Sequence, residues 1–149
     1  MNKMILNKGT LLTASIALVT LFASLLVTGC GDEEKKEVAA EKAIKKINSY
    51  EGFQKVVNNA GDKLLVFDLY ADWCRPCRIL SPMLEQVAKE HKDKAEVYKI
   101  NVDTNPQVAR MFQVRGIPYV VFMKNKKAIH AVQGVQPKEA YVDAIVQLQ

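Results

Sequence analysis

The stretch that decides the fold is LLVFDLYADWCRPC, Leu64–Cys77. It begins with an apolar run of strand length, 64–71, and such a run is typical of a strand buried on both faces of a sheet. The run leads into WCRPC, where two cysteines are separated by two residues. Apolar residues then recur at helical spacing over 79–88. The stretch therefore predicts a strand, a turn that carries two thiols, and a helix with one buried face.

Outward from this stretch, helical and strand patterns alternate. The expected elements are a helix at 50–59, a strand at 64–71, a helix at 79–88, a strand at 95–103, a helix at 106–112, strands at 119–123 and 128–134, and a helix that begins at 137. Asn105 is expected to cap the short helix at 106–112. The early strand–helix–strand units imply parallel strands, and the late hairpin adds antiparallel ones. We expect an α/β domain over 50–149, with a central mixed β-sheet flanked by helices.

The composition of the 149 residues is that of an ordinary globular protein, with 49% hydrophobic and 25% charged residues. Three cysteines are too few for a disulfide-rich scaffold. The net charge of +5 includes Lys3 and Lys8, which lie in a segment that we expect to be removed. Elsewhere basic and acidic residues are mixed, so no stripe for binding nucleic acid is predicted.

The first 29 residues have the pattern of a secretory signal peptide. Two lysines and no acid precede an uncharged run, Thr10–Gly29. An uncleaved membrane anchor is the alternative, because the run approaches the length of about 20 residues that spans a bilayer. Both alternatives place the rest of the chain outside the cytoplasm.

The end of this run, VTGC at Val27–Cys30, resembles the lipobox of bacterial lipoproteins, although Val27 stands where leucine is usual. The resemblance implies cleavage before Cys30 and lipidation of its sulfur. That sulfur would then be a thioether, which forms no disulfide and binds no metal. We therefore expect a lipid anchor at Cys30, on the periplasmic side of a bacterial membrane or on the cell surface.

Residues 30–49 are rich in Glu, Lys and Ala and contain few large apolar side chains. They predict a flexible or marginally helical tether that holds the following domain away from the membrane. A polybasic lipid-binding helix is less favoured, because acidic residues interleave with the lysines.

The two thiols of WCRPC could serve a metal site, a structural disulfide or redox chemistry. A zinc or iron–sulfur site usually takes four ligands, and the other candidates are the isolated His91 and His130 and the lipidated Cys30. No metal is therefore expected. A purely structural disulfide would close so small a loop that it would restrict the unfolded chain little. Redox chemistry is the favoured interpretation.

Four motifs carry a resemblance to a known family. They are FDLYADWCRPC at 67–77, VYKINVD at 97–103, VRGIP at 114–118 and VQG at 132–134. In this order and spacing they resemble the thioredoxin family over about 50–149. The resemblance implies the thioredoxin fold and a thiol–disulfide oxidoreductase that needs no cofactor. It also implies that Cys74 is the nucleophile and Cys77 the resolving thiol.

Physical chemistry agrees with these two roles. A helix N-terminus favours an anion, and hence the thiolate of Cys74, which is the form that attacks a disulfide. Residues at i and i+3 of a helix are close enough for Cys74 and Cys77 to form a disulfide. Attack on a partner would give a mixed disulfide, from which Cys77 would release the reduced partner.

Asp68 interrupts an apolar run, and a buried carboxyl has a raised pKa that suits a proton acceptor near neutral pH. The alternative is a frayed strand end that faces water. The resemblance implies a buried Asp68 beneath Cys77, with Lys99 as its neighbour. Lys99 could also be an ordinary surface lysine on an edge strand.

The resemblance implies a substrate-binding surface around the thiols. Its expected members are Trp73, Arg75, Pro76, Ile117, Pro118 and Gly134. Pro118 matches a cis-proline of the family, whereas Trp73 could instead be a packing residue. The chain departs from the family where Arg75 replaces a common glycine, Tyr70 a common tryptophan and Tyr119 a common threonine.

The expected function is that of a membrane-tethered, extracytoplasmic reductant of protein disulfides. Expected partners are proteins with disulfides or thiols and a membrane electron relay, and the chain is expected to be a monomer. A disulfide-forming oxidant is the alternative, because Arg75 places a cation beside Cys74. A metal-delivery protein and a redox-silent binding module are alternatives from other functional classes.

Overall fold

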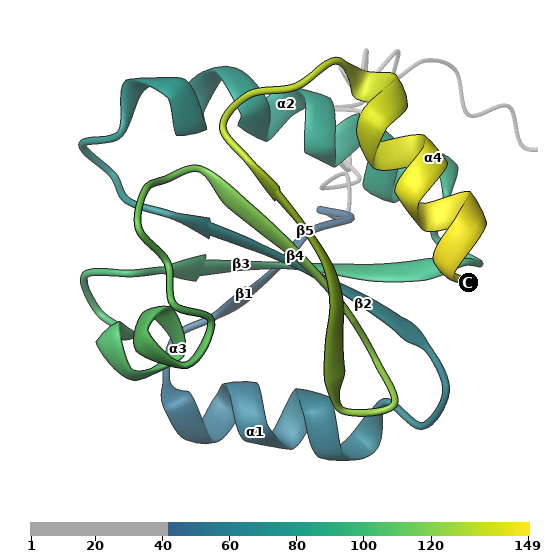
Figure 1. Cartoon of the computed structure of the whole chain (residues 1–149), viewed down its shortest axis with the longest axis horizontal. Helices are drawn as coiled ribbons and strands as arrows, with labels where there is room; N and C mark the ends of the chain where they lie inside the picture. Colours follow the sequence, from purple (N-terminus) through teal and green to yellow (C-terminus); the bar gives the residue numbers. More distant parts are fainter. Residues whose placement is uncertain (1–41) are drawn as a thin grey trace, which may run out of the picture. The chain divides into compact units, whose positions relative to one another are not determined.

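The computed structural model describes residues 42–149 as nine helices and strands (Figure 1). In chain order these are β1 (Lys45–Ile47), α1 (Tyr50–Asn59), β2 (Leu64–Tyr70), α2 (Arg75–Glu90), β3 (Ala95–Asn101), α3 (Pro106–Met111), β4 (Tyr119–Lys124), β5 (Lys127–Gln133) and α4 (Lys138–Leu148). The strands form one five-stranded sheet in the order β1-β3-β2-β4-β5. The expected mixed sheet is confirmed: β1, β3 and β2 run parallel, and β4 and β5 are antiparallel to their neighbours.

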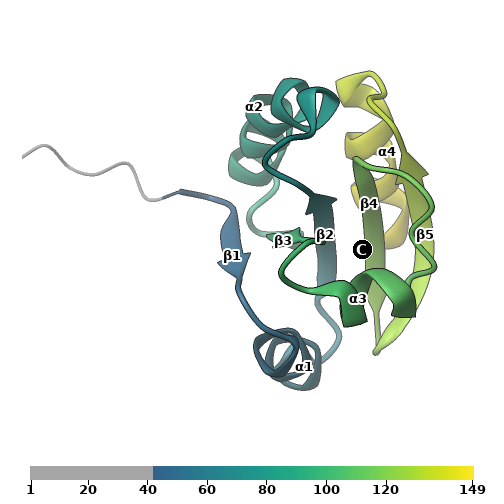
Figure 2. The same ribbon diagram turned by 90° about the vertical axis from the view of Figure 1, so that its left-hand side faces the viewer.

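Helices cover both faces of the sheet, with α2 and α4 on one face and α1 and α3 on the other (Figures 1 and 2). The central strand β2 alternates between these two layers, as strand geometry requires. Leu64 and Val66 pack with α2 and α4, whereas Phe67 and Leu69 pack with α1 and α3. The same alternation turns the Asp68 side chain toward the α2 layer, together with Val66.

Strand β1 was not predicted from the sequence. Lys45–Ile47 pairs in parallel with Tyr98–Ile100 of β3, and Ile47 is buried. The prediction of a tether through residue 49 is therefore wrong for these three residues, and the folded domain begins before Tyr50. A three-residue strand with two exposed lysines has too few apolar positions to show a period of two. The expected signal peptide, Cys30 and the tether up to residue 41 lie outside the described residues.

The other expected elements are confirmed, with ends that differ by a few residues. Asn105 precedes α3, but its side chain makes no capping hydrogen bond. Its Nδ2 atom donates instead to the carbonyl oxygen of Asn101 and to Oγ1 of Thr104. Among the helices at 42–149, none has the length and apolar character needed to cross a bilayer.

Candidate active site

The two cysteines lie at the junction between the end of β2 and the start of α2. Cys74 is the N-cap residue of α2, and its Sγ atom accepts a hydrogen bond of 3.2 Å from the backbone N–H of Cys77. Pro76 occupies the first turn, where a missing N–H leaves no helical hydrogen bond unmade. Cys74 and Cys77 form a disulfide, with Cα atoms 5.3 Å apart. The predicted placement at a helix N-terminus is confirmed.

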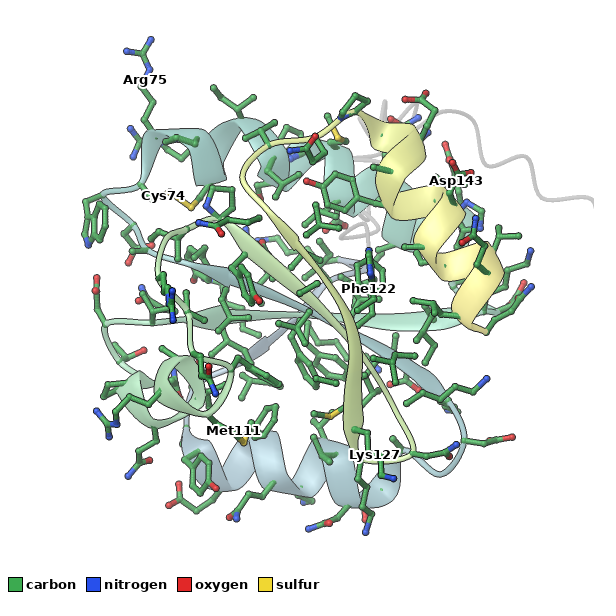
Figure 3. All side chains as sticks on the ribbon, viewed as in Figure 1. Cys74, Arg75, Met111, Phe122, Lys127 and Asp143 are labelled. Atoms are coloured by element: carbon green, nitrogen blue, oxygen red, sulfur yellow. A yellow bond between two sulfur atoms is a disulfide. The ribbon has the colours of Figure 1, made fainter. Side chains whose placement is uncertain are left out.

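The disulfide is shielded from solvent, because Cys74 and Cys77 are each only 3% exposed. Figure 3 shows Cys74 at the N-terminal end of α2, with Arg75 beside it pointing away from the domain. Ile117 and Tyr70 pack against the cysteine pair. A protein partner must therefore contact the residues that surround the disulfide in order to reach its sulfur atoms.

The expected substrate-binding residues of the second half of the chain meet at this point. The Ile117–Pro118 peptide bond is cis, and Pro118 is buried. The backbone N–H of Gly134 donates a 2.9 Å hydrogen bond to the carbonyl oxygen of Pro118. Gly134 has a φ of 77°, a left-handed conformation that favours glycine. The loop before β4 and the end of β5 are thus joined at Pro118.

Trp73 lies on the surface of this site. Its side chain is 69% exposed, so the alternative of a packing residue is wrong. Its Nε1 atom donates a 2.9 Å hydrogen bond to Asp103 Oδ2, and Asn101 Nδ2 donates to Asp72 Oδ2 at 3.1 Å. Asp72, Asn101 and Asp103 were not predicted as site residues. Asn101 ends β3, and Asp72 and Asp103 lie shortly beyond the ends of β2 and β3. These positions were the available signal, because the carboxyl ends of parallel strands meet at one edge of a sheet.

Asp68 is buried in the sheet, at 1% exposure, so the alternative of a frayed strand end is wrong. Neither carboxyl oxygen has a hydrogen-bond partner among the described residues. Burial raises the pKa of Asp68 to about 6, and the positive charge of Lys99 opposes part of that rise. The carboxyl is therefore suited to exchange a proton near neutral pH.

Lys99 lies on β3, between β1 and β2, so the alternative of an edge-strand lysine is wrong. Its Nζ atom lies 3.6 Å from Asp68 Oδ2 and donates a 2.7 Å hydrogen bond to Ser81 Oγ. The ammonium also lies 4.6 Å from the centre of the Tyr70 ring. Lys99, Ser81, Tyr70 and Cys77 line one open pocket of about 230 Å³. Ser81 was not identified from the sequence, because a serine within a helix has no distinguishing pattern.

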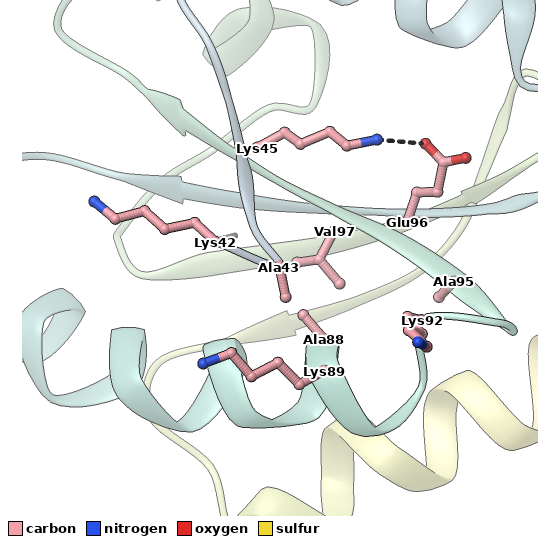
Figure 4. A pocket seen from close by; sticks show the side chains of 9 residues that line it. All are labelled: Lys42, Ala43, Lys45, Ala88, Lys89, Lys92, Ala95, Glu96 and Val97. Carbon is pink, nitrogen blue, oxygen red and sulfur yellow. Dashed lines mark ion pairs between the residues drawn. The ribbon is translucent and has the colours of Figure 1, made fainter. Parts of the chain in front are cut away.

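A different pocket, of about 430 Å³, lies beside the other end of α2 (Figure 4). Four lysines line it, namely Lys42, Lys45, Lys89 and Lys92, and Glu96 forms an ion pair with Lys45 at 3.7 Å. Neither cysteine lines this pocket, so it takes no direct part in thiol chemistry. Across residues 42–149, no group of three or more His, Cys, Asp or Glu side chains is arranged to hold a metal ion.

Comparison with known proteins agrees with this architecture. Residues 32–147 match the thioredoxin family profile. Thioredoxin from Alicyclobacillus acidocaldarius is 40% identical over 87 residues, which cover 58% of this chain and 81% of that protein. Thioredoxin from Buchnera aphidicola subsp. Baizongia pistaciae is 42% identical over 76 residues, or 51% of this chain and 70% of that protein.

Solved structures give the same result. The Malassezia sympodialis thioredoxin Mala s 13 has a TM-score of 0.64 at 36% identity, covering 70% of this chain and 90% of that one. Fasciola hepatica thioredoxin has a TM-score of 0.67 at 28% identity, covering 71% of this chain and all 100% of that one. The expected thioredoxin fold is therefore confirmed. The chain belongs to the thioredoxin family, as a thiol–disulfide oxidoreductase whose redox-active pair is Cys74 and Cys77.

Proposed function

We propose that this oxidoreductase reduces protein disulfides outside the cytoplasm while it is tethered to a membrane by a lipid on Cys30. The observation that carries the reductive direction is the buried Asp68, with its raised pKa, next to Lys99 in the layer that holds α2. A carboxylate there can take the proton of a resolving thiol, which the reductive half-reaction requires.

The reaction begins when the Cys74 thiolate attacks one sulfur of a substrate disulfide. A Cys74–substrate disulfide forms and the other substrate sulfur leaves as a thiolate. The Cys77 thiol then gives its proton to the Asp68 carboxylate and attacks the Cys74 sulfur. The Cys74–Cys77 bond forms, the second substrate sulfur leaves as a thiolate, and two electrons have passed to the substrate. The oxidised form of the enzyme that results is the Cys74–Cys77 disulfide seen in the structure.

The substrate would lie across Trp73, Ile117, Pro118 and Gly134. The exposed indole and the cis peptide bond before Pro118 lie on segments that surround the disulfide. An extended segment of the substrate could pair with the backbone beside Pro118, because this part of the chain precedes β4 and belongs to no strand. Pro76 would limit the flexibility of the turn that carries Cys74.

The tether is compatible with this geometry. Ala43 donates a 2.8 Å backbone hydrogen bond to Glu85 Oε1, which fixes the start of the domain beside the second half of α2. Cys74 lies at the opposite end of this helix, whose 16 residues span about 24 Å. The described chain therefore begins beside the end of α2 that lies away from the disulfide. A membrane electron relay would reduce the pair again after each cycle, and the chain would act as a monomer.

The equilibrium reduction potential of the Cys74–Cys77 pair tests the direction of electron flow. A value near about −270 mV supports a reductant, and a value near about −120 mV supports an oxidant. The oxidant remains the second candidate, because Arg75 is exposed and adjacent to Cys74. Failure to reduce the disulfides of insulin would contradict the proposed reductase.

The anchor is tested separately, by growing cells with labelled palmitate and isolating the protein. We expect label in the wild-type chain, where the lipid is attached to Cys30, and none in Cys30→Ser. Cys74→Ser is the matched control, because it removes a different cysteine and should keep the label. Label that persists in Cys30→Ser would contradict the lipid anchor without affecting the redox assignment.

A further inference from the structure

The Lys99 ammonium is held by groups from separate elements of the fold. Ser81 of α2 accepts its 2.7 Å hydrogen bond, and the Tyr70 ring of β2 lies beneath it at 4.6 Å. Asp68 Oδ2 lies at 3.6 Å, which is beyond a direct hydrogen bond. Ser81 is thus the side chain that makes the short contact with this ammonium.

Such support matters because a lysine ammonium is strongly hydrated and sits on a flexible four-carbon chain. Only 16% of the Lys99 side chain is exposed, so most of it lies away from water. Without an acceptor inside the pocket, the ammonium would gain hydrogen bonds by extending toward solvent. The Ser81 hydroxyl accepts a hydrogen bond that water would otherwise accept, so the ammonium does not need to extend toward solvent.

We propose that Ser81 is a positioning residue for the thiol–disulfide exchange, because its hydroxyl holds the Lys99 ammonium beside the Asp68 carboxyl in the pocket that Cys77 also lines. The proposal concerns the placement of Lys99 and rests on the proposed function only in assigning Asp68 the proton-accepting step. Tyr70 assists by offering the face of its ring to the same ammonium.

Several titratable or charged groups surround the Asp68 carboxyl and the pocket beside it, on every element that packs against them. They are Lys46 of β1, Tyr70 and Asp72 at the end of β2, Cys77 and Arg78 of α2, Lys99 of β3 and Tyr141 of α4. Among them, Lys99 supplies the charge that lowers the pKa of Asp68, against the larger effect of burial. Moving Lys99 away should therefore let the carboxyl hold its proton to higher pH.

The test follows the Asp68 carboxyl directly, by ¹³C NMR of the full oxidised chain in detergent with labelled aspartate. Asp68→Asn assigns the signal. In Ser81→Ala the titration midpoint should rise by roughly half a pH unit, and in Lys99→Met by about one unit or more. Ser81→Thr keeps the hydroxyl and should titrate as the wild type does. Because Ser81 acts through Lys99, the double variant should match Lys99→Met alone.

Two results would overturn the proposal: an unchanged midpoint in Ser81→Ala, or an additional rise when Ser81→Ala is combined with Lys99→Met. A thermal melt of each variant shows whether it folds. If Ser81→Ala disturbs folding, the comparison of Lys99→Met with the double variant still tests the proposal. The assay is independent of turnover. If Asp68→Asn left the pH profile of insulin reduction unchanged, the proton-accepting role of Asp68 would fail while the NMR result for Ser81 stood.

Discussion

Asp68 and Lys99 lie opposite each other in register on the parallel strands β2 and β3, with Lys99 Nζ 3.6 Å from Asp68 Oδ2. The pairing places a buried carboxyl, which has no hydrogen-bond partner among residues 42–149, next to a cation that only partly offsets the effect of burial on its pKa. This balance makes the carboxyl useful as a proton acceptor and costly for the stability of the fold.

The first prediction concerns that cost. Folding raises the pKa of Asp68 from 3.8 to about 6, so the folded state holds the proton more tightly than the unfolded state does. Stability from this group is fully present below about pH 4 and is lost as the pH rises through about 6. Asp68→Asn should therefore stabilise the oxidised protein by about 3 kcal/mol at pH 8 and by little at pH 4. Urea unfolding at both pH values measures the difference, and an equal effect at both would contradict it.

A second prediction concerns the rate. Asp68→Asn removes the proposed proton acceptor and should slow insulin reduction at pH 7 by about 100-fold. Because Asn keeps the shape of the side chain, the Cys74–Cys77 disulfide should still form. In Cys77→Ser the mixed disulfide should accumulate, since the resolving thiol is absent. A wild-type rate in Asp68→Asn would remove Asp68 from the mechanism.

The third prediction uses the hydrogen bond between Trp73 Nε1 and Asp103 Oδ2. Asp103→Ala should free the indole and raise KM for a protein substrate about fivefold, with kcat nearly unchanged, as expected for about 1 kcal/mol of lost positioning. Asp103→Asn retains a side-chain oxygen acceptor and should stay close to wild type. Trp73 is the single tryptophan of the chain, so its fluorescence reports the same change. An unaltered KM in Asp103→Ala would show that this contact does not position the substrate.

A fourth prediction tests the first strand. Ile47 is 5% exposed and packs with α1 and the sheet, so Ile47→Ala should destabilise the domain by about 2–4 kcal/mol. Lys46→Ala, at the neighbouring exposed position, should change stability by less than about 0.5 kcal/mol. Equal effects of the two substitutions in denaturant unfolding would argue that β1 does not belong to the folded domain.

The fifth prediction concerns Arg75, the exposed residue next to Cys74. Its cation favours the thiolate and hence the reduced form, so Arg75→Gly should make the reduction potential more negative by about 10–30 mV. Arg75→Lys keeps the positive charge and serves as the control. Equilibration with glutathione measures both, and a shift of Arg75→Lys as large as that of Arg75→Gly would show that the positive charge does not set the reduction potential.

Local patterns in the sequence were sufficient to predict most of the fold. The apolar run at 64–71 and the helical spacing after Cys77 correspond to β2 and α2, because strand and helix periods are written in neighbouring residues. Strand β1 was not predicted, because three residues are too few to show a strand period. Its formation depends instead on hydrogen bonds to β3.

The sequence by itself determined that two thiols lie at the start of a helix, because their spacing and the preceding strand are local features. Only the tertiary structure decided their surroundings. The register between β2 and β3 sets Lys99 beside Asp68, and the packing of α2 on the sheet brings Ser81 to the same ammonium. These contacts join residues far apart in the chain, and their distances determine how much charge the buried carboxyl feels.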